Sequence, residues 1–200
     1  MIVTALRGGG VAALMLLGAA PARKALWVMA ILLIAQFSRS VGASELFSAI
    51  DQHQEPAAIE LVRQGRAAEL NARNAQGDSV IHRAVETGMR HLLQALVARG
   101  ADVQARTSNG EAALHLAALH PEPVFTDILL AAGADVRARN ADGESPLHWA
   151  ALSGHIVVAQ RLLARGADPR QKTAKGLTAR DYARREGHAE IARLLERVDQ

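Results

Sequence analysis

The sequence predicts an all-α repeat solenoid, because three sets of marker residues recur at a step of 33 positions, as from 77 to 110. The first set is a glycine column at Gly77, Gly110, Gly143 and Gly176. The second is a histidine column at His82, His115 and His148. The third is a glycine followed by Ala-Asp, at Gly100, Gly133 and Gly166. A fixed period of this size is typical of stacked helical repeats, so most of the chain is expected to form one array.

The most regular copy, residues 139–171, predicts a turn followed by two short helices. Asp142-Gly143 marks the tip of the turn. Ser145-Pro146 starts the first helix, because serine is a favoured N-cap and proline suits the first helical position. Gly154 ends that helix in the left-handed conformation that glycine adopts without strain. The apolar side chains expected to face inward are Leu147, Ala150 and Ala151 in the first helix and Val158, Leu162 and Leu163 in the second.

This copy resembles an ankyrin repeat. The family's pattern is a Gly turn, Thr-Pro-Leu-His-x-Ala-Ala, Gly-His and Leu-Leu-x-x-Gly-Ala-Asp, and residues 142–168 read DGESPLHWAA, GH and LLARGAD at those places. The resemblance covers residues 44–200. It implies an ankyrin array of about four repeats plus an N-terminal cap, built of helix-turn-helix units joined by β-turn or hairpin loops. The expected units are 44–72 (cap), 73–105, 106–138, 139–171 and 172–200 (C-terminal cap).

The other units depart from the pattern in places. The first unit lacks the turn, and two extra residues follow Gly65. The third has Ala112-Ala113 in place of Thr-Pro and Pro121-Glu122-Pro123 in place of Gly-His-x, so the turn between its helices must differ. The changed sequence of this loop either reflects drift that the fold tolerates or reshapes the loop to contact a partner. The last unit has Asp181 in the histidine column and a polar outer face, as a terminal cap should.

Residues 1–43 predict a signal peptide. They contain no Asp or Glu, and an apolar run, Ala25–Ala35, follows Arg23-Lys24. Small residues at Val41 and Ala43 favour cleavage after Ala43. The run is too short to cross a bilayer, which needs about 20 apolar residues. Two alternatives stay open, an uncleaved anchor in the inner membrane and a true start at Met15.

Charge and composition exclude several classes of function. Residues 1–43 hold four of the 23 basic residues and none of the 20 acidic ones, which leaves 19 basic against 20 acidic residues. The rest of the chain therefore lacks the basic excess of a nucleic-acid binder. Cysteine is absent, so disulfides and thiol chemistry are excluded. Arginine outnumbers lysine twenty to three, which suggests a GC-rich bacterial genome.

The histidine column invites a metal interpretation, because three imidazoles can bind zinc. In ankyrin repeats, however, this histidine ties the turn backbone together, and successive copies lie about 8–10 Å apart, too far for a shared ion. The resemblance therefore implies structural histidines, with no metal and no cofactor. His155 and His188, in the Gly-His column, are expected to be structural as well. No nucleophile motif or phosphate-binding loop occurs, so the chain is not expected to be an enzyme.

The resemblance implies a protein partner on the concave side, formed by turn tips and first helices. Carrying the family's surface positions over gives the candidates Arg106, Asn109, Glu111, Leu119, His120, Arg139, Asp142, Glu144, Trp149, Leu152 and Ser153. Among them, Leu119 and Leu152 near Trp149 form the best candidate patch, because interface hot spots favour Trp in central positions. Core packing is the competing role for Trp149. Basic residues such as Arg106 and Arg139 precede the turns and form a basic row. Acidic residues such as Glu111 and Glu144 follow the turns and form an acidic row. Apart from partner binding, both rows are expected to be a solvated surface.

These observations predict a non-catalytic, monomeric scaffold in the bacterial periplasm, or secreted, that binds an envelope or stress-response protein. The alternative is an inhibitor or immunity protein that neutralises a toxic effector enzyme. The protein is expected to contact the membrane only transiently, through its signal peptide during export.

Overall fold

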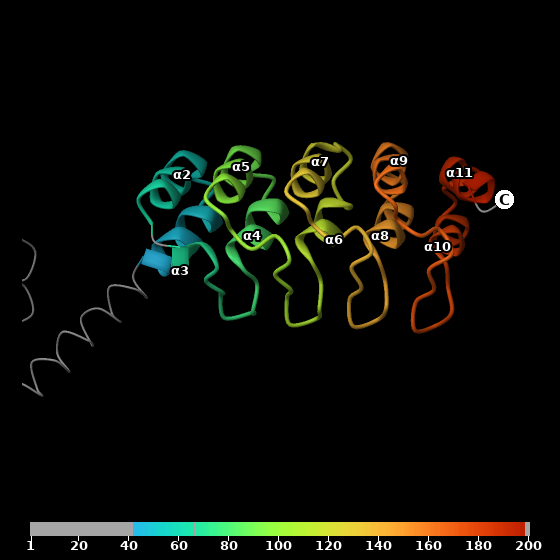
Figure 1. Cartoon of the computed structure of the whole chain (residues 1–200), viewed down its shortest axis with the longest axis horizontal. Coiled ribbons are helices and arrows are strands. Elements are labelled where there is room, and N and C mark those ends of the chain that lie inside the picture. The colour runs from blue at the N-terminus through green and yellow to red at the C-terminus, as the bar shows by residue number, and fades with distance from the viewer. Residues whose placement is uncertain (1–41, 66, 199–200) are drawn as a thin grey trace, which may run out of the picture. The chain divides into compact units, whose positions relative to one another are not determined.

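The computed structural model describes residues 42–65 and 67–198, which form a row of helix pairs (Figure 1). A helix spans residues 42–51. The other helices are α2 (Glu55–Gln64), α3 (Ala67–Leu70), α4 (Val80–Glu86), α5 (Arg90–Ala98), α6 (Ala113–Ala117), α7 (Val124–Ala131), α8 (Pro146–Ser153), α9 (Ile156–Ala164), α10 (Ala179–Arg185) and α11 (Ala189–Val198).

The pairs stack into two layers of helices with a row of hairpins at one edge. The first helices of the pairs, α4, α6, α8 and α10, pack successively against one another, and α5, α7, α9 and α11 form the second layer. The hairpins before α4, α6, α8 and α10 project from the first layer (Figure 1). Isolated bridges close two of them, Arg73 to Ser79 and Arg106 to Ala112. The described residues contain no strands beyond such bridges, which confirms the predicted all-α solenoid.

The core lies between the two layers and is continuous along the array. In the template repeat, Leu147, Ala150 and Ala151 are fully buried, as expected. Val158 and Leu162 are fully buried too, whereas Leu163 is only half-buried. Alanine in the first helices lets neighbouring helices approach closely, so each repeat buries its apolar face on the next.

The irregular repeats differ where the sequence departs from the pattern. After Gly65, the short helix α3 begins at Ala67. In the third unit, α6 ends earlier than α8 does: its C-cap is Ala118 with φ −70°, whereas α8 ends at the left-handed Gly154. Pro123 then caps α7. The turn between α6 and α7 therefore differs, as the proline predicts.

The predicted signal peptide lies outside the described residues, apart from its last positions. The first helix begins at residue 42, so cleavage after Ala43 would fall within its first turn. Among the helices of residues 42–65 and 67–198, none is long and apolar enough to cross a membrane.

Substitution of two glycines by alanine can distinguish the cost of backbone strain from the cost of a steric clash. Gly154 has φ 78° and Gly166 has φ 92°, so alanine should cost about 1–2 kcal/mol of unfolding free energy at either site. A Cβ at Gly154 would also lie 2.7 Å from His188 Cε1, whereas nothing lies within 4 Å of one at Gly166. The His188 ring cannot turn away without losing its 3.0 Å Nε2 bond to the Leu152 carbonyl. Urea unfolding should therefore rank Gly154→Ala as more destabilising than Gly166→Ala, and equal losses would contradict this account.

Candidate functional site

The histidine column links neighbouring repeats. In the central repeat, His115 Nε2 lies 3.1 Å from the Glu144 carbonyl of the next hairpin, and its Nδ1 accepts the Ala112 N–H at 3.0 Å. Nε2 must therefore carry the proton and donate it. The equivalent Nε2 bonds run from His82 to the Glu111 carbonyl (3.0 Å) and from His148 to the Leu177 carbonyl (3.2 Å). In each ring Nδ1 bonds the N-cap residue of its own helix and Nε2 bonds a carbonyl of the next hairpin. The structural role expected of this column is therefore confirmed.

Burial keeps these histidines neutral. It lowers the pKa of His115 to about 4, and it lowers the pKa of His82 and His148 as well. A neutral ring with a single N–H matches the donor and acceptor that it faces. Within the described part of the chain, no group of three or more His, Asp or Glu side chains could hold a metal ion.

A second histidine set bonds carbonyls near the ends of the first helices. His155 Nδ1 lies 3.1 Å from the Ala118 carbonyl, and His188 Nε2 lies 3.0 Å from the Leu152 carbonyl. His120 does the same with the Val85 carbonyl at 2.7 Å, and its ring packs on Phe125 at 4.6 Å between centroids. Carbonyls in the last turn of a helix are not fully bonded within that helix, so these bonds between repeats stabilise the stack. His120, a candidate for partner binding, thus serves the fold.

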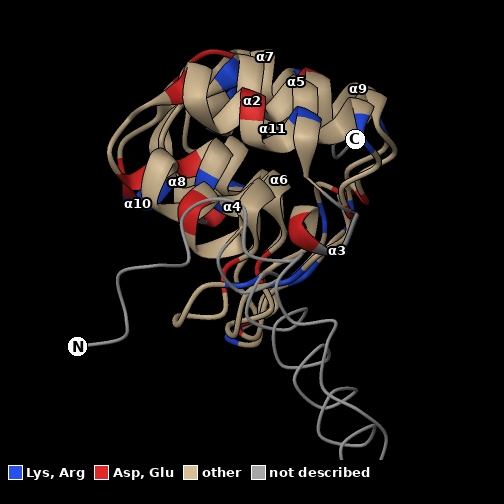
Figure 2. Cartoon of the chain, turned by 90° about the vertical axis from the view of Figure 1, so that its left-hand side faces the viewer, with Lys and Arg blue, Asp and Glu red and all other residues tan. Residues whose placement is uncertain are grey.

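The hairpins are bonded to one another along the array. Ala141 N–H donates to the Asn109 carbonyl at 2.9 Å, and Ala174 N–H donates to the Asp142 carbonyl at 2.8 Å. Arg139 Nη2 donates to the Lys172 carbonyl at 2.9 Å. Arg73 likewise donates to the Arg106 carbonyl, so these two arginines join neighbouring hairpins (Figure 2 shows Lys and Arg in blue). The side chains of Asn109 and Asp142 are exposed at the tips and remain accessible to a partner.

Arg106 and Glu111 have more local roles. Arg106 Nη1 donates to the Gly110 carbonyl of its own hairpin at 3.4 Å, and Thr107 Oγ1 donates to the Glu111 carboxylate at 3.2 Å. Arg106 and Glu111 are both half-buried. Ser153, at the end of α8, is also half-buried.

Glu144 is the centre of a polar cluster that joins two repeats. Its carboxylate accepts Trp149 Nε1–H at 2.8 Å, Tyr182 O–H at 2.5 Å and Asn140 Nδ2–H at 3.0 Å. Burial acts to raise the pKa of Glu144, but these three hydrogen bonds outweigh it and lower the pKa below its usual value. The sequence predicts a solvated acidic row at Glu144, whereas the structure shows that Glu144 is half-buried and that its carboxylate accepts three hydrogen bonds. The sequence does hold a signal for this cluster: Trp149 follows Glu144 by five residues, and Tyr182 occupies the same column as Trp149 in the next repeat, 33 residues later.

The cluster fixes two aromatic rings. Trp149 packs edge-on against His115 at 5.4 Å between ring centroids, and Tyr182 packs similarly against His148 at 5.5 Å. Trp149 is half-buried, with its N–H bound to the hairpin and its ring beside the core. It is therefore partly a packing residue and partly a surface residue.

The ionisation of Tyr182 can be used to measure the effect of the Glu144 carboxylate. Tyr182 is the single tyrosine of the sequence, and burial followed by the Glu144 carboxylate raises its pKa to about 12. Glu144→Gln removes the negative charge, so the Tyr182 pKa should fall toward its ordinary value of about 10. Absorbance near 295 nm, measured at about pH 10.5 where circular dichroism still shows the folded state, should show more tyrosinate in the variant. If the wild type and Glu144→Gln gave the same tyrosine titration curve, Tyr182 could not be in contact with the Glu144 carboxylate.

Four apolar side chains of the central repeats form a surface, called here the apolar strip: Leu116, Leu119, Trp149 and Leu152. Leu119 is 42% exposed, and the other three are half-buried against the core. Trp149 and Leu152 lie three residues apart on one face of α8, and the step of 33 places Leu116 and Leu119 in the matching columns of the preceding repeat. The best candidates from the sequence thus lie in two neighbouring repeats, with Trp149 and Leu152 on α8 and Leu119 in the turn that follows α6.

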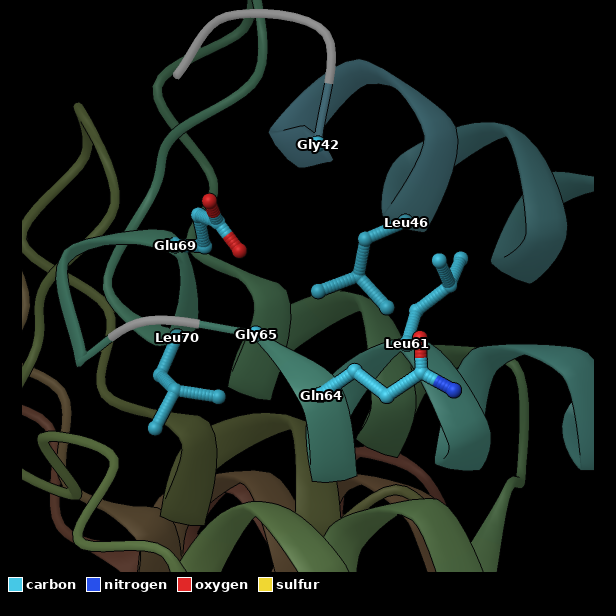
Figure 3. Close-up of a pocket in the computed structure, with 7 residues that line it drawn as sticks. All are labelled: Gly42, Leu46, Leu61, Gln64, Gly65, Glu69 and Leu70. Atoms are coloured by element: carbon cyan, nitrogen blue, oxygen red, sulfur yellow. The ribbon is translucent and has the colours of Figure 1, made fainter. Parts of the chain in front are cut away.

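A small pocket of about 130 Å³ lies in the first unit (Figure 3). Leu46, Leu61 and Leu70 line it together with the carboxylate of Glu69 and the amide of Gln64. Its lining provides neither a nucleophile nor a pair of acid and base groups, so the pocket suggests no reaction.

Stacked helix pairs with bonded hairpins define a class, that of the helical repeat scaffolds. A family model described as ankyrin repeats in three copies matches residues 32–140 and 114–199. The chain belongs to the ankyrin-repeat family. Proteins of this family generally mediate protein–protein interaction and are typically non-catalytic. The comparison with curated proteins found no match.

Proposed function

We propose that this protein is an exported, non-catalytic scaffold that binds a protein partner with the first-helix face of its central repeats. The observation that carries the proposal is the apolar strip. Leu119 is exposed in the turn that follows α6, and Trp149 and Leu152 are half-buried on α8 of the next repeat. Neither α6 nor α8 contains a charged residue. Larger exposed apolar patches that are rimmed by polar residues mark interaction sites.

The rigidity of the surface supports the same proposal. The strip stands on helices whose neighbours are joined by histidine bonds, hairpin bonds and the Glu144 cluster. A preformed surface loses little conformational entropy when it binds, so a small patch can give useful affinity. The exposed tips at Asn109 and Asp142 would form the polar rim of this interface.

Photo-crosslinking tests the proposed face with a matched control. Leu119 and Val157 are 42% and 44% exposed, but Val157 lies on α9 in the second layer. A photoreactive amino acid at position 119 should capture a specific protein from cells, and the same group at position 157 should not. Capture at position 157 alone, or equal labelling at both, would overturn the proposed face.

Export is the second part of the proposal, supported by the charge and apolar pattern of residues 1–43. N-terminal sequencing of protein recovered from the envelope should begin near Ser44. A start at Met1 or Met15 would favour the anchored alternative and contradict cleavage.

A further inference from the structure

The arginines of the helices and the arginines of the segments between helices have different kinds of partner. Five helical arginines form ion pairs with carboxylates: Arg63, Arg83, Arg161, Arg184 and Arg185. Five arginines of the connecting segments donate to carbonyl oxygens instead: Arg73, Arg99, Arg106, Arg137 and Arg139. In the part of the chain that the structure describes, none of this second set forms an ion pair. A carbonyl bond holds a guanidinium in place without neutralising its charge.

Two of these arginines line a recess of about 500 Å³ on the segment that leads from α9 to the hairpin of α10. The recess, called here the arginine recess, is lined by Arg137, Arg139, Asp168 and Gln171 together with residues 166, 167 and 169. Arg137 Nε donates to the Gly166 carbonyl at 3.0 Å, and Arg139 Nη2 donates to the Lys172 carbonyl at 2.9 Å. The two guanidiniums are thus fixed at opposite ends of the same segment.

Both guanidiniums are accessible to a ligand. Arg137 and Arg139 are exposed, and Ala138 between them is buried at 2% exposure. Among the described residues, Arg137 bonds the protein only through Nε, so its Nη groups are left for a ligand. A guanidinium has five N–H donors in a planar fork, and this fork matches the two oxygens of a carboxylate.

The charge of the recess favours a few carboxylates over a continuous anionic surface. Its lining holds two positive groups and the carboxylate of Asp168, whose Oδ1 accepts the Arg170 N–H at 2.9 Å. The lining therefore has a net charge of about +1. Nucleic-acid backbones and anionic lipid surfaces bind concentrated basic clusters, which this recess does not provide. A short acidic stretch of a protein places separate carboxylates on separate guanidiniums and can avoid Asp168.

We propose that the arginine recess binds an acidic segment of a protein, with one carboxylate on Arg137 and another on Arg139. The recess lies on connecting segments, whereas the apolar strip lies on α6, α8 and the turn after α6. The inference therefore goes beyond the proposed function and gives the protein a second recognition surface.

The preceding repeat supplies a variant that removes the charge and keeps the fold. Gln104 occupies the column of Arg137, 33 positions earlier, and its Nε2 donates to the Gly133 carbonyl at 2.7 Å, as Arg137 does to the Gly166 carbonyl. Arg137→Gln should therefore keep this contact between repeats and leave the melting temperature unchanged. Arg161→Gln is the matched control, because it changes the net charge equally but removes an exposed arginine of α9 that lies 3.7 Å from Asp127.

Fluorescence anisotropy on the full chain tests the inference with a labelled peptide of alternating Glu and Ser, and with the same peptide carrying Gln for Glu. The Glu peptide should bind the wild type, less tightly as salt is added, and the Gln peptide should not bind. Arg137→Gln should weaken binding of the Glu peptide about tenfold or more, because it removes charge-assisted hydrogen bonds. Arg161→Gln should change the affinity by less than about twofold.

Several results would overturn the inference: no binding of the Glu peptide, equal losses in the two glutamine variants, or anionic phospholipid vesicles that displace the peptide and bind the wild type but not Arg137→Gln. If Arg137→Gln melts at a lower temperature than the wild type, Arg137→Lys decides, because it keeps the charge. Peptide affinity retained in Arg137→Lys supports the inference, and affinity lost as in Arg137→Gln contradicts it. Leu119→Ala should bind the peptide as the wild type does, so this inference and the proposed function can fail separately.

Discussion

Acidification from about pH 7 to about pH 4 is expected to destabilise the array by on the order of 3 kcal/mol through His115 alone. Burial lowers the pKa of this ring from 6.5 to about 4 in the folded protein. Between these two values the unfolded chain binds more protons than the folded one, so stability rises with pH across that window. Below about pH 4 both states are protonated, and this contribution no longer changes. The lowered pKa values of His82 and His148 add losses of the same sign.

Urea unfolding at several pH values measures this effect. His115→Gln removes the titrating group while keeping an amide that can bond, so the variant should lose less stability between about pH 6.5 and about pH 4 than the wild type. The quantity compared is the slope with pH, and any constant cost of the substitution cancels. Parallel slopes would show that His115 is not buried neutral between the repeats.

Leu147→Ala is expected to cost about 2–5 kcal/mol of unfolding free energy. Leu147 is fully buried in α8, which packs on both α6 and α10. The cavity would therefore weaken two repeat interfaces, and the stability of a repeat array depends on the coupling between neighbours. Chemical unfolding followed by circular dichroism should show the loss, with a broader transition if the two halves uncouple.

Leu119→Ala is the matched leucine replacement for this experiment. Since Leu119 is 42% exposed, its removal should change stability by no more than about 0.5 kcal/mol. Similar losses at both leucines would mean that Leu119 belongs to the core and not to a binding surface.

The regular part of the fold could be predicted because each repeat carries its own local signals. Ser145, Pro146 and Gly154 determine where α8 begins and ends, and the structure places its N-cap, its first turn and its left-handed end at these residues. The role of the histidine column followed from the family resemblance, and His115 and His148 confirm it.

Contacts between repeats were harder to predict. His120 lies where the glycine pattern is lost, so nothing in its neighbourhood indicates a bond to Val85, 35 positions earlier. Tyr182 reaches Glu144 across 38 positions, and this contact depends on the exact stacking of two repeats. Such contacts change the interpretation of the candidate surface, because Glu144 and His120 support the fold, while Leu119 remains exposed.

The apolar strip is proposed to bind a protein partner. Calorimetric titration of the captured partner into the wild type, Leu119→Ala and Val157→Ala tests it most directly, because the two side chains are equally exposed on different layers. We expect Leu119→Ala to weaken binding about tenfold or more, with an unchanged melting temperature, and Val157→Ala to bind as the wild type does. Unchanged affinity in Leu119→Ala, or a loss confined to Val157→Ala, would contradict it.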